Sequence, residues 1–334
     1  MSSVDIIAIK HYDGTIRTSP FYVRFRRRVL KKSQIKIQIN GDATDIENFC
    51  IDAGDKHARF VWDNKLIHWE GEFWPVYQTW ELQAEASMTN EKKREYYTSM
   101  MDRLLPRTET IKKLNLKEGV NVVNFILGEG RVATSRIYFW SCDQRIVVSD
   151  VDGTITGKGE NFSRFSKFYT NHFYVKRIRP SIIELYKSIE DNGYKVIYVT
   201  GRPVRQYAVI KKLLLDIRQE DDENNTMPEG PIFTTPYKFY ISRAFKVRCG
   251  RPDQFKTSML TRIKMLYPEH INEPIVAGFG NTSTDIMSYK KSGVNPSMCF
   301  FVNKDHSVAS DRKNFKNYAH IKEAVHEMFP KHDR

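Results

Sequence analysis

The 334-residue sequence lacks several features that mark other classes of protein. No run approaches the roughly 18–20 consecutive apolar residues of a membrane-spanning helix, which excludes an integral membrane protein. Four cysteines lie scattered at positions 50, 142, 249 and 299 without a CxxC pair, so we expect neither a cysteine zinc site nor a disulfide framework. The first residues show no basic segment followed by an apolar one, so we expect no secretory signal and a reducing, intracellular compartment.

The sequence does contain enough apolar material for ordinary cores, together with an excess of positive charge. Hydrophobic residues make up 40% and aromatic residues 13%, which excludes a generally disordered chain. The length predicts two domains. Lysine and arginine number 53 against 40 acidic residues, giving a net charge of +13. This balance favours a polyanionic partner, which is nucleic acid, an anionic membrane surface or a phosphorylated substrate.

The first 60 residues read as strands. Apolar and polar residues alternate through residues 21–25 and again through 35–39. An apolar run at residues 4–10 precedes Asp13-Gly14, and Asn40-Gly41 follows the last run; both pairs are typical of hairpin turns. Strict alternation predicts strands with one buried and one exposed face, as in a β-sandwich.

A second strand pair follows a stretch of weaker pattern. We interpret residues 61–110 as a connector, with a helix predicted at 89–105. Apolar runs at 120–127 and 132–140 then flank a turn at 128–130. Because two short strand clusters rarely stand alone, we expect this late hairpin to complete the early sandwich.

From residue 145 the pattern changes to alternating strands and helices. Strands are predicted at 145–149, 195–199 and 273–279. Helices are predicted at 181–190, where Ser181 and Glu184 suit a capping box, and from 252 to about 266. This alternation is typical of a parallel sheet, so the predicted fold class is an α/β domain plus an all-β domain.

The strongest chemical signal is the motif from Ser149 to Thr154, which reads SDVDGT. An apolar strand runs directly into two carboxylates, and ligands of open parallel sheets lie at the carboxyl ends of strands. One carboxylate can attack phosphorus, and the other can protonate the leaving alkoxide and later activate water. Two carboxylates repel each other and a phosphate, so Mg²⁺ is expected beside them. The motif predicts Asp150 as nucleophile and Asp152 as general acid and base, with a plain Asp-Gly turn as the alternative.

Other predicted strand ends and helix starts carry groups suited to phosphate. A threonine hydroxyl and backbone N–H groups at 200–202 can hold phosphate oxygens. Lys256, near a helix start, can neutralise phosphate charge, with Lys246 as the alternative. Asn281 and Asp285 offer oxygen ligands for Mg²⁺, or else serve as a turn residue and a helix cap. The predicted catalytic residues are Asp150, Asp152, Thr200 and Lys256; the substrate-binding residues are Gly153, Thr154, Gly201 and Arg202; the metal ligands are Asp150, Asp152, Asn281 and Asp285.

In this order, these pieces resemble the haloacid-dehalogenase-type phosphohydrolases, whose catalytic domain is a Rossmann-like parallel sheet. The run Asp150 to Thr156 (DVDGTIT) is similar to the signature of the lipins, which are Mg²⁺-dependent phosphatidate phosphatases. LNLKEGVN at 114–121, YFW at 138–140 and GFGN at 278–281 also resemble lipin C-terminal sequence. Segments 19–25 and 37–41 resemble the lipin N-terminal region, so the resemblance covers roughly residues 1–60 and 110–330.

The resemblance implies conversion of phosphatidic acid to diacylglycerol at a membrane surface, by a cytoplasmic protein peripherally bound to the endoplasmic reticulum or nuclear membrane. It also implies that residues 1–60 and 111–141 form an immunoglobulin-like sandwich beside a catalytic domain at 142–334. Two alternatives stay open. One is a phosphatase of the same superfamily that acts on a soluble phosphomonoester or a phosphoprotein, and the other is a non-enzymatic lipid-binding regulator.

A basic segment accompanies the early strands. Seven cations and no acidic residue lie within residues 24–36. Each surface cation contributes about 1 kcal/mol of attraction to an anionic membrane. A solvated face is the alternative, and nucleic acid is not expected because no recognised binding module accompanies the segment. The predicted membrane-binding residues are Arg24, Arg26, Arg27, Arg28, Lys31 and Lys32.

Charge reversal within this basic segment tests its role. Replacing Arg26, Arg27 and Arg28 together by glutamate should weaken sedimentation with anionic vesicles, because attraction to the surface is lost. Hydrolysis of a soluble phosphate ester should be unchanged. Vesicle sedimentation equal to that of the wild-type protein would refute the membrane role.

Overall fold

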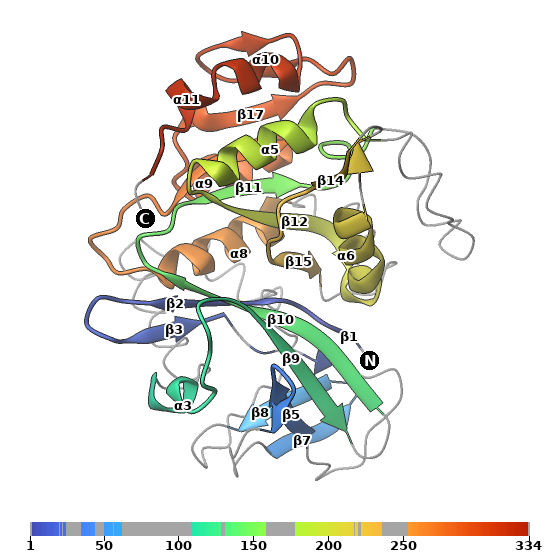
Figure 1. Cartoon of the computed structure of the whole chain (residues 1–334), viewed down its shortest axis with the longest axis vertical. Helices are drawn as coiled ribbons and strands as arrows, with labels where there is room; N and C mark the ends of the chain where they lie inside the picture. The colour runs from blue at the N-terminus through green and yellow to red at the C-terminus, as the bar shows by residue number, and fades with distance from the viewer. Residues whose placement is uncertain are drawn as a thin grey trace.

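The computed structural model describes residues 2–19, 21, 23–24, 35–43, 50–55, 57–61, 108–127, 131–157, 178–216, 218–219, 222–235 and 253–332. Figure 1 shows two groups of sheets stacked on each other, with the N-terminal strands in the lower group and the C-terminal elements in the upper one. Among the described helices, none combines the length and the apolar character needed to cross a bilayer.

A six-stranded sheet joins early and late parts of the chain in the order β3-β2-β10-β9-β5-β6. Its strands are β2 (Ile6–Lys10), β3 (Ile16–Thr18), β5 (Ile35–Ile39), β6 (Asp42–Ala43), β9 (Gly119–Leu127) and β10 (Arg131–Ser141). Strand β10 pairs in parallel with β2, and β9 pairs antiparallel with β5. The prediction that the late hairpin joins the early strands is therefore confirmed.

The turns of this sheet follow the expected chemistry. Between β5 and β6, Asn40 has φ 54° and Gly41 has φ 96°. Two consecutive residues in the left-handed region match the twist of a tight hairpin, and asparagine and glycine adopt it at the lowest cost. Gly14 plays the same part between β2 and β3, with φ 82°. Both predicted hairpin turns are therefore present.

A second, four-stranded sheet has the order β1-β4-β8-β7. Its strands are β1 (Ser2–Ser3), β4 (Val23–Arg24), β7 (Cys50–Asp55) and β8 (His57–Val61). The predicted strand at 21–25 is thus partly present as β4. The helix predicted at 89–105 and the turn at 128–130 lie outside the described residues; the described α3 (Thr108–Lys112) begins within the last residues of the predicted connector.

The C-terminal part is built on a seven-stranded sheet in the order β15-β12-β11-β16-β17-β18-β19. The first five strands run parallel, and β18 and β19 extend the edge in antiparallel fashion. The strands are β11 (Ile146–Asp150), β12 (Lys195–Pro203), β15 (Ile232–Thr235), β16 (Ile275–Gly280), β17 (Cys299–Val302), β18 (Val308–Ala309) and β19 (Asn314–Phe315). The predicted α/β sheet is confirmed.

Helices cover both faces of this sheet. Helices α5 (Ile182–Asp191), α6 (Tyr207–Asp216), α10 (Tyr318–Glu323) and α11 (Val325–Met328) share one apolar cluster with it. Helices α8 (Asp253–Met265) and α9 (Ser283–Lys291) share another. The short elements η1 (Val204–Gln206), η2 (Pro296–Met298), β13 (Arg218–Gln219) and β14 (Asp222–Thr226) complete the described part. Strand β11 is buried along its whole length, which explains its continuous apolar run.

Helix α8 lies between the two groups of sheets, as Figure 1 shows. Its Met259, Leu260 and Ile263 join one apolar cluster with β11 and β12 and with β2 and β10. In β2, Ile7 and Ile9 belong to this cluster. Ile6 and Ala8 point to the opposite face of the six-stranded sheet, where they join a second apolar cluster. Because both faces of β2 are buried, its sequence is a continuous apolar run rather than an alternating one.

Two details of the prediction are wrong. The capping box at Ser181 is absent, because Ser181 has left-handed backbone (φ 59°) and its side chain makes no capping hydrogen bond. Strand β12 continues past Val199 to Pro203, where a register shift against β15 separates Thr200 from Pro203. This irregularity lets Thr200, Gly201 and Arg202 belong to the strand rather than to a loop after it.

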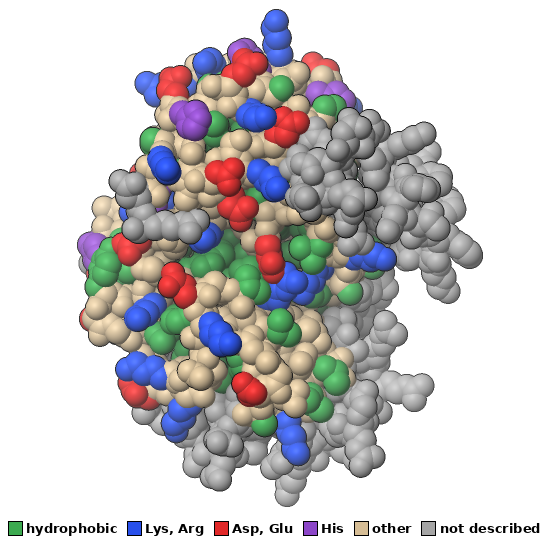
Figure 2. All heavy atoms as spheres, viewed as in Figure 1, with side chains coloured by type: hydrophobic (Ala, Val, Ile, Leu, Met, Phe, Trp, Pro, Cys, Tyr) green, Lys and Arg blue, Asp and Glu red, His purple; other side chains and the backbone are tan. Residues whose placement is uncertain are grey.

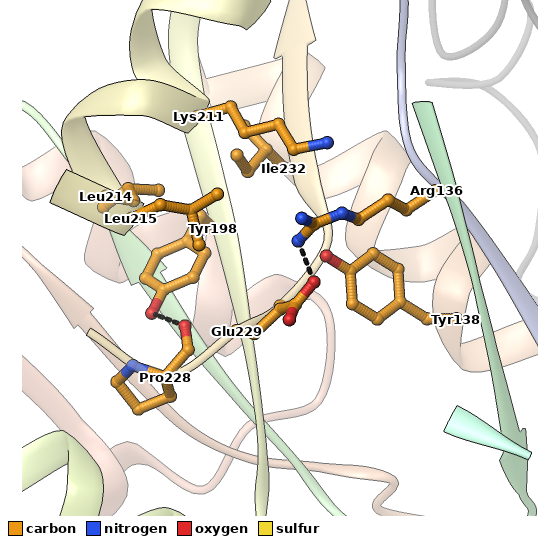
Figure 3. A pocket seen from close by; sticks show the side chains of 10 residues that line it. Arg136, Tyr138, Tyr198, Lys211, Leu214, Leu215, Pro228, Glu229 and Ile232 are labelled. Atoms are coloured by element: carbon orange, nitrogen blue, oxygen red, sulfur yellow. Dashed lines mark hydrogen bonds and ion pairs between the residues drawn. The ribbon is translucent and has the colours of Figure 1, made fainter. Parts of the chain in front are cut away.

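A buried carboxylate joins the two groups of sheets. Asp5 is 1% exposed and accepts hydrogen bonds from the Tyr207 hydroxyl and from the backbone N–H groups of Arg136 and Ile232, both at 3.0 Å. Burial raises the pKa of Asp5. Beside it, Arg136 of β10 forms an ion pair with Glu229, which precedes β15. Both side chains line a small cavity, as does Lys211 (Figure 3). This polar junction ties β10 to β15 and α6.

Removing the Asp5 carboxylate should destabilise the fold. Asp5→Ala leaves three buried donors without their acceptor, so the free energy of unfolding should fall by about 2–5 kcal/mol. Tyr207→Phe removes one donor and should cost about 1–2 kcal/mol. Urea unfolding of both variants measures this, with Asp42→Ala, an exposed carboxylate of β6, as the control. If Asp5→Ala unfolds at the same urea concentration as the control, the junction does not stabilise the fold.

Candidate active site

Three neighbouring parallel strands end at the same edge of the seven-stranded sheet. Asp150 ends β11 and lies in register with Val199 of β12. On the other side β11 pairs with β16, which ends at Gly280 just before Asn281. The residues after these strands therefore converge, as the sequence predicts.

A single ammonium bridges two buried carboxylates at this edge. Lys256, near the start of α8, donates to Asp150 Oδ1 at 2.6 Å and to Asp285 Oδ1 at 2.5 Å. Asp150 is 5% exposed, Lys256 8% and Asp285 3%. The geometry thus favours Lys256 for the active-site role, and Lys246 lies outside the described residues. The bridge unites β11, α8 and α9 in one charged cluster.

Burial and neighbouring charges shift the protonation of this cluster. Burial raises the pKa of Asp150 to about 7, with Lys256 opposing the shift and the like charges of Asp285 and Asp152 adding to it. Burial would raise the pKa of Asp285 as well, but Lys256 and hydrogen bonds from Thr282 outweigh it and the pKa is lowered. Burial would lower the pKa of Lys256, but the two carboxylates outweigh it and the pKa is raised. When both carboxylates are ionised, the cluster carries one excess negative charge.

Asp152 is held by a different cation. The Nε of Arg202 donates to Asp152 Oδ2 at 2.7 Å, and a second guanidinium nitrogen binds Oδ1. The Thr200 hydroxyl donates to the same Oδ2 at 3.3 Å. The Asp152 side chain is 44% exposed, whereas that of Arg202 is 8% exposed. The arginine expected to contact substrate therefore orients Asp152, and Gly201 lies in β12 between these two partners.

The loop after β11, residues 151–156 and here named the β11 loop, packs tightly against Asn281. Gly153 has φ 86°, and a Cβ atom there would lie 2.0 Å from Asn281 Nδ2. Only glycine satisfies both the backbone angle and this approach. The Thr154 hydroxyl lies 3.4 Å from Asp150 Oδ2. Gly153 thus lets the β11 loop approach Asn281 closely, and Thr154 places its hydroxyl beside Asp150.

Asp285 serves two partners at the start of α9. Its Oδ2 accepts from the Thr282 hydroxyl at 2.6 Å and from the Thr282 backbone N–H at 3.1 Å, which completes a capping box. Its Oδ1 is left for Lys256. The two interpretations of this residue, as a cap and as a site carboxylate, are therefore compatible.

A cation suits the charge of the cluster. Across the described residues, no group of three or more acidic, histidine or cysteine side chains is arranged to hold a metal ion by itself. Mg²⁺ typically takes only one or two protein carboxylates and completes its shell with water and phosphate oxygens. The excess negative charge of the cluster, with Asp152 and the Asn281 amide beside it, fits that requirement.

Two buried side chains that sequence reasoning missed also hold the β11 loop. Arg179 donates to the Gly153 carbonyl through Nε at 3.0 Å and Nη2 at 2.8 Å. The Tyr318 hydroxyl donates to the Thr154 carbonyl at 3.0 Å. Arg179 lies 26 positions after Gly153, and Tyr318 comes from α10 far along the chain, so no spacing relates either one to the motif.

The predicted membrane-binding residues mostly lie outside the described part. Arg26, Arg27, Arg28, Lys31 and Lys32 are not described, and of Arg24 only its backbone position in β4 is. Figure 2 shows lysine and arginine side chains scattered among acidic ones over the face in view. The membrane role of the basic segment stays a prediction.

Comparison with protein families gives two matches. Residues 102–330 match the model of LNS2 (Lipin/Ned1/Smp2), and residues 1–68 match that of the lipin N-terminal conserved region. Phosphatidate phosphatase PAH1 of Arabidopsis thaliana is 31% identical over 254 residues, covering 74% of this chain and 27% of that protein. Phosphatidic acid phosphohydrolase 1 of Saccharomyces cerevisiae is 30% identical over 239 residues, covering 66% of this chain and 26% of that protein.

The chain thus spans about a quarter of the length of these two relatives. A solved structure of DsGPDH of Dunaliella salina aligns with 45% of this chain and 22% of that chain at 18% identity. Its TM-score of 0.28 is too low to inform the fold.

The raised pKa of Asp150 predicts that the free energy of unfolding depends on pH when a chelator keeps metal ions away from the site. The pKa rises from an ordinary 3.8 to about 7 on folding, so the folded state binds the extra proton between these values. The free energy that this carboxyl contributes is therefore lost as the pH rises from about 4 to about 7. Asp150→Asn removes the group, so its stability relative to wild type should rise across that range and level off above it. Urea unfolding at several pH values, with Asp42→Asn as the control, measures this; a difference independent of pH would contradict it.

Proposed function

The chain belongs to the LNS2 (Lipin/Ned1/Smp2) family, and from this membership and the site geometry we propose that it is a Mg²⁺-dependent phosphatidate phosphatase. Its reaction is the hydrolysis of phosphatidic acid to diacylglycerol and phosphate. The observation that carries the proposal is the buried Asp150 carboxylate beside Lys256, with Asp152 two residues further on. The names of two relatives about 30% identical, a phosphatidate phosphatase and a phosphatidic acid phosphohydrolase, support the substrate.

In the proposed cycle, Asp150 is the nucleophile. Its carboxylate oxygen forms a bond to phosphorus while the bond from phosphorus to the glycerol oxygen breaks. The glycerol oxygen takes a proton from Asp152, and diacylglycerol leaves. Water then attacks phosphorus and gives its proton to Asp152, the bond to Asp150 breaks, and phosphate leaves. Asp150 and Asp152 return to their starting protonation states.

The surrounding groups hold and neutralise the phosphoryl group. Lys256 already contacts the nucleophile, so its charge offsets the negative charge that phosphate brings. Hydrogen bonds from Thr200 and Arg202 fix the orientation of the Asp152 carboxylate before substrate enters. Arg202 must release at least one Asp152 oxygen for that oxygen to carry a proton, and a phosphate oxygen is a suitable new partner for the guanidinium. Gly153, Thr154 and Gly201 complete the proposed substrate-binding set.

Asp150, Asp152, Asn281 and Asp285 are the proposed holders of Mg²⁺. When bound, the ion supplies positive charge that offsets the repulsion between these carboxylates and the phosphate. The excess negative charge of the Asp150, Lys256 and Asp285 cluster supports this assignment.

The proposed organisation follows the two matched regions. Residues 1–60 and 111–141 would form an immunoglobulin-like sandwich, 61–110 a connector, and 142–334 a haloacid-dehalogenase-type catalytic domain. The pairing of β10 with β2 and of β9 with β5 supports the first part, and the parallel order of β12, β11 and β16 supports the last. The proposed location is the cytoplasmic surface of the endoplasmic reticulum or nuclear membrane, with the basic segment of residues 24–36 on the lipid.

Phosphate release from phosphatidic acid in mixed micelles tests the function. Wild type should release phosphate only with Mg²⁺, and Asp150→Asn should lower kcat by at least about 1,000-fold because the nucleophile is gone. Asp143→Asn is the matched control, because Asp143 precedes β11 at the end of the strand away from the site and should leave kcat unchanged.

Other outcomes separate the alternatives. Cleavage of a soluble phosphomonoester without release from phosphatidic acid would keep the mechanism and overturn the lipid substrate. Equal rates for wild type and Asp150→Asn would overturn the nucleophile. No release from any phosphate ester would favour a non-enzymatic lipid-binding role.

A further inference from the structure

We propose that Arg179, together with Tyr318 on the adjacent carbonyl, is a positioning residue that holds the β11 loop in its reactive geometry. Neither residue touches the proposed reacting atoms. Both act through the loop that carries Asp152 and Thr154. The expected effect on catalysis rests on the proposed function, whereas the hydrogen bonds from Arg179 and Tyr318 to the loop are a property of the fold.

The partners of Arg179 indicate what its charge is for. Arg179 is only 2% exposed, and its guanidinium donates to the carbonyls of Gly153 and Asn303, the latter at 2.9 Å. His306 Nδ1 lies 3.4 Å from the same guanidinium. Within the part of the chain that the structure describes, no carboxylate lies within ion-pair distance of Arg179. Burial lowers the pKa of Arg179, with the Asp305 carboxylate opposing the shift from beyond ion-pair distance, so this cation is held mainly by its hydrogen bonds to backbone carbonyls.

The two N–H groups on Gly153 fix more than one atom. A peptide unit is planar, so a carbonyl held by two donors also fixes the plane that runs from Gly153 into Thr154. On the other side of Gly153, Asn281 fills the space that a Cβ would need. The Gly153 backbone is thus held between Arg179 and Asn281.

Rotation of this peptide would move two groups of the site. Asp152 directly precedes Gly153, and the Thr154 hydroxyl faces Asp150 Oδ2 at 3.4 Å. Tyr318 restrains the next carbonyl, that of Thr154, at 3.0 Å. Arg179 and Tyr318 therefore hold two consecutive carbonyls of the β11 loop, and both side chains are buried.

The support for this grip comes from the C-terminal part of the chain. Arg179 is anchored at Asn303 and His306, which lie in the turn between β17 and β18. Tyr318 begins α10, which packs against α5. The end of the chain thereby braces the loop that follows β11.

The test compares Arg179→Lys with Arg145→Lys as a matched control. Lysine keeps the charge but lacks the two-pronged donor set, so kcat on phosphatidic acid in mixed micelles should fall roughly 10- to 100-fold with KM within about twofold. Arg145 donates to the Asp143 carbonyl at 3.2 Å, at the end of β11 away from the site, so its variant should keep wild-type kcat. Tyr318→Phe should lower kcat in the same direction by a smaller factor.

Hydrogen exchange supplies a readout that does not depend on activity. Deuterium uptake by the peptide containing residues 150–157 should be faster in Arg179→Lys, because the Ile155 and Thr156 amides bond within this loop to the Val151 carbonyl. Uptake by the α8 peptide should match wild type, and thermal melting gives the folded fraction used to normalise kcat.

Each outcome decides the matter. A folded Arg179→Lys protein with wild-type kcat and wild-type loop exchange would overturn the proposal. If wild type releases no phosphate from any ester, the proposed function fails, and faster loop exchange still supports the grip while unchanged exchange overturns it. Should Arg179→Lys not fold, Tyr318→Phe takes its place: wild-type kcat and exchange in that variant would overturn the proposal.

Discussion

The site depends on one ammonium shared between two buried carboxylates. Lys256 draws Asp150 at the end of β11 and Asp285 at the start of α9 to the same point. Removing the Lys256 ammonium would leave two buried carboxylates without a counter-charge, which is strongly destabilising, whereas removing either carboxylate would leave one balanced ion pair. Neighbouring donors reduce the remaining imbalance, with Thr282 on Asp285 and Arg202 on the nearby Asp152. The strand edge is therefore organised by charge as much as by backbone topology.

The position of Lys256 is set by a helix that two sheets hold in place. Helix α8 packs through Met259, Leu260 and Ile263 against the parallel sheet and against β2 and β10. The N-terminal strands thus help to fix the site without supplying a residue to it. The Asp5 junction adds a polar link between the same two layers, through Arg136 of β10 and Ile232 of β15. This architecture gives a physical reason for keeping the two matched regions in one folded unit.

Much of the site could be predicted because local patterns determine it. A buried strand followed by polar residues marks a strand end, so Asp150, Thr200 and Asn281 were placed at one edge from the sequence. The pairing of Arg202 with Asp152 could not be predicted, because it depends on the shifted register of β12 against β15.

Arg179, Tyr318 and Asp5 were missed for a related reason. Each contacts partners remote in sequence, and in a linear pattern each reads as an ordinary charged or aromatic residue. The absent capping box at Ser181 illustrates a similar limit, since the left-handed backbone there overrides a favourable residue pair. The strand β2 was anticipated as an apolar run, but its burial on both faces depends on elements that come much later.

The burial of β2 on both faces has a consequence for the chain while it is being synthesised. Strand β2 ends at Lys10, whereas its parallel partner β10 begins at Arg131 and helix α8, which packs against Ile7 and Ile9, begins at Asp253. During translation the face of β2 that carries Ile6 and Ala8 can pack early against Ile16, Phe21 and Ile37, whereas the face that carries Ile7 and Ile9 emerges long before α8 is made. Exposed apolar surface makes a nascent chain prone to misassociation. The face of β2 that carries Ile7 and Ile9 therefore stays without its native cover until residues far along the chain have been synthesised.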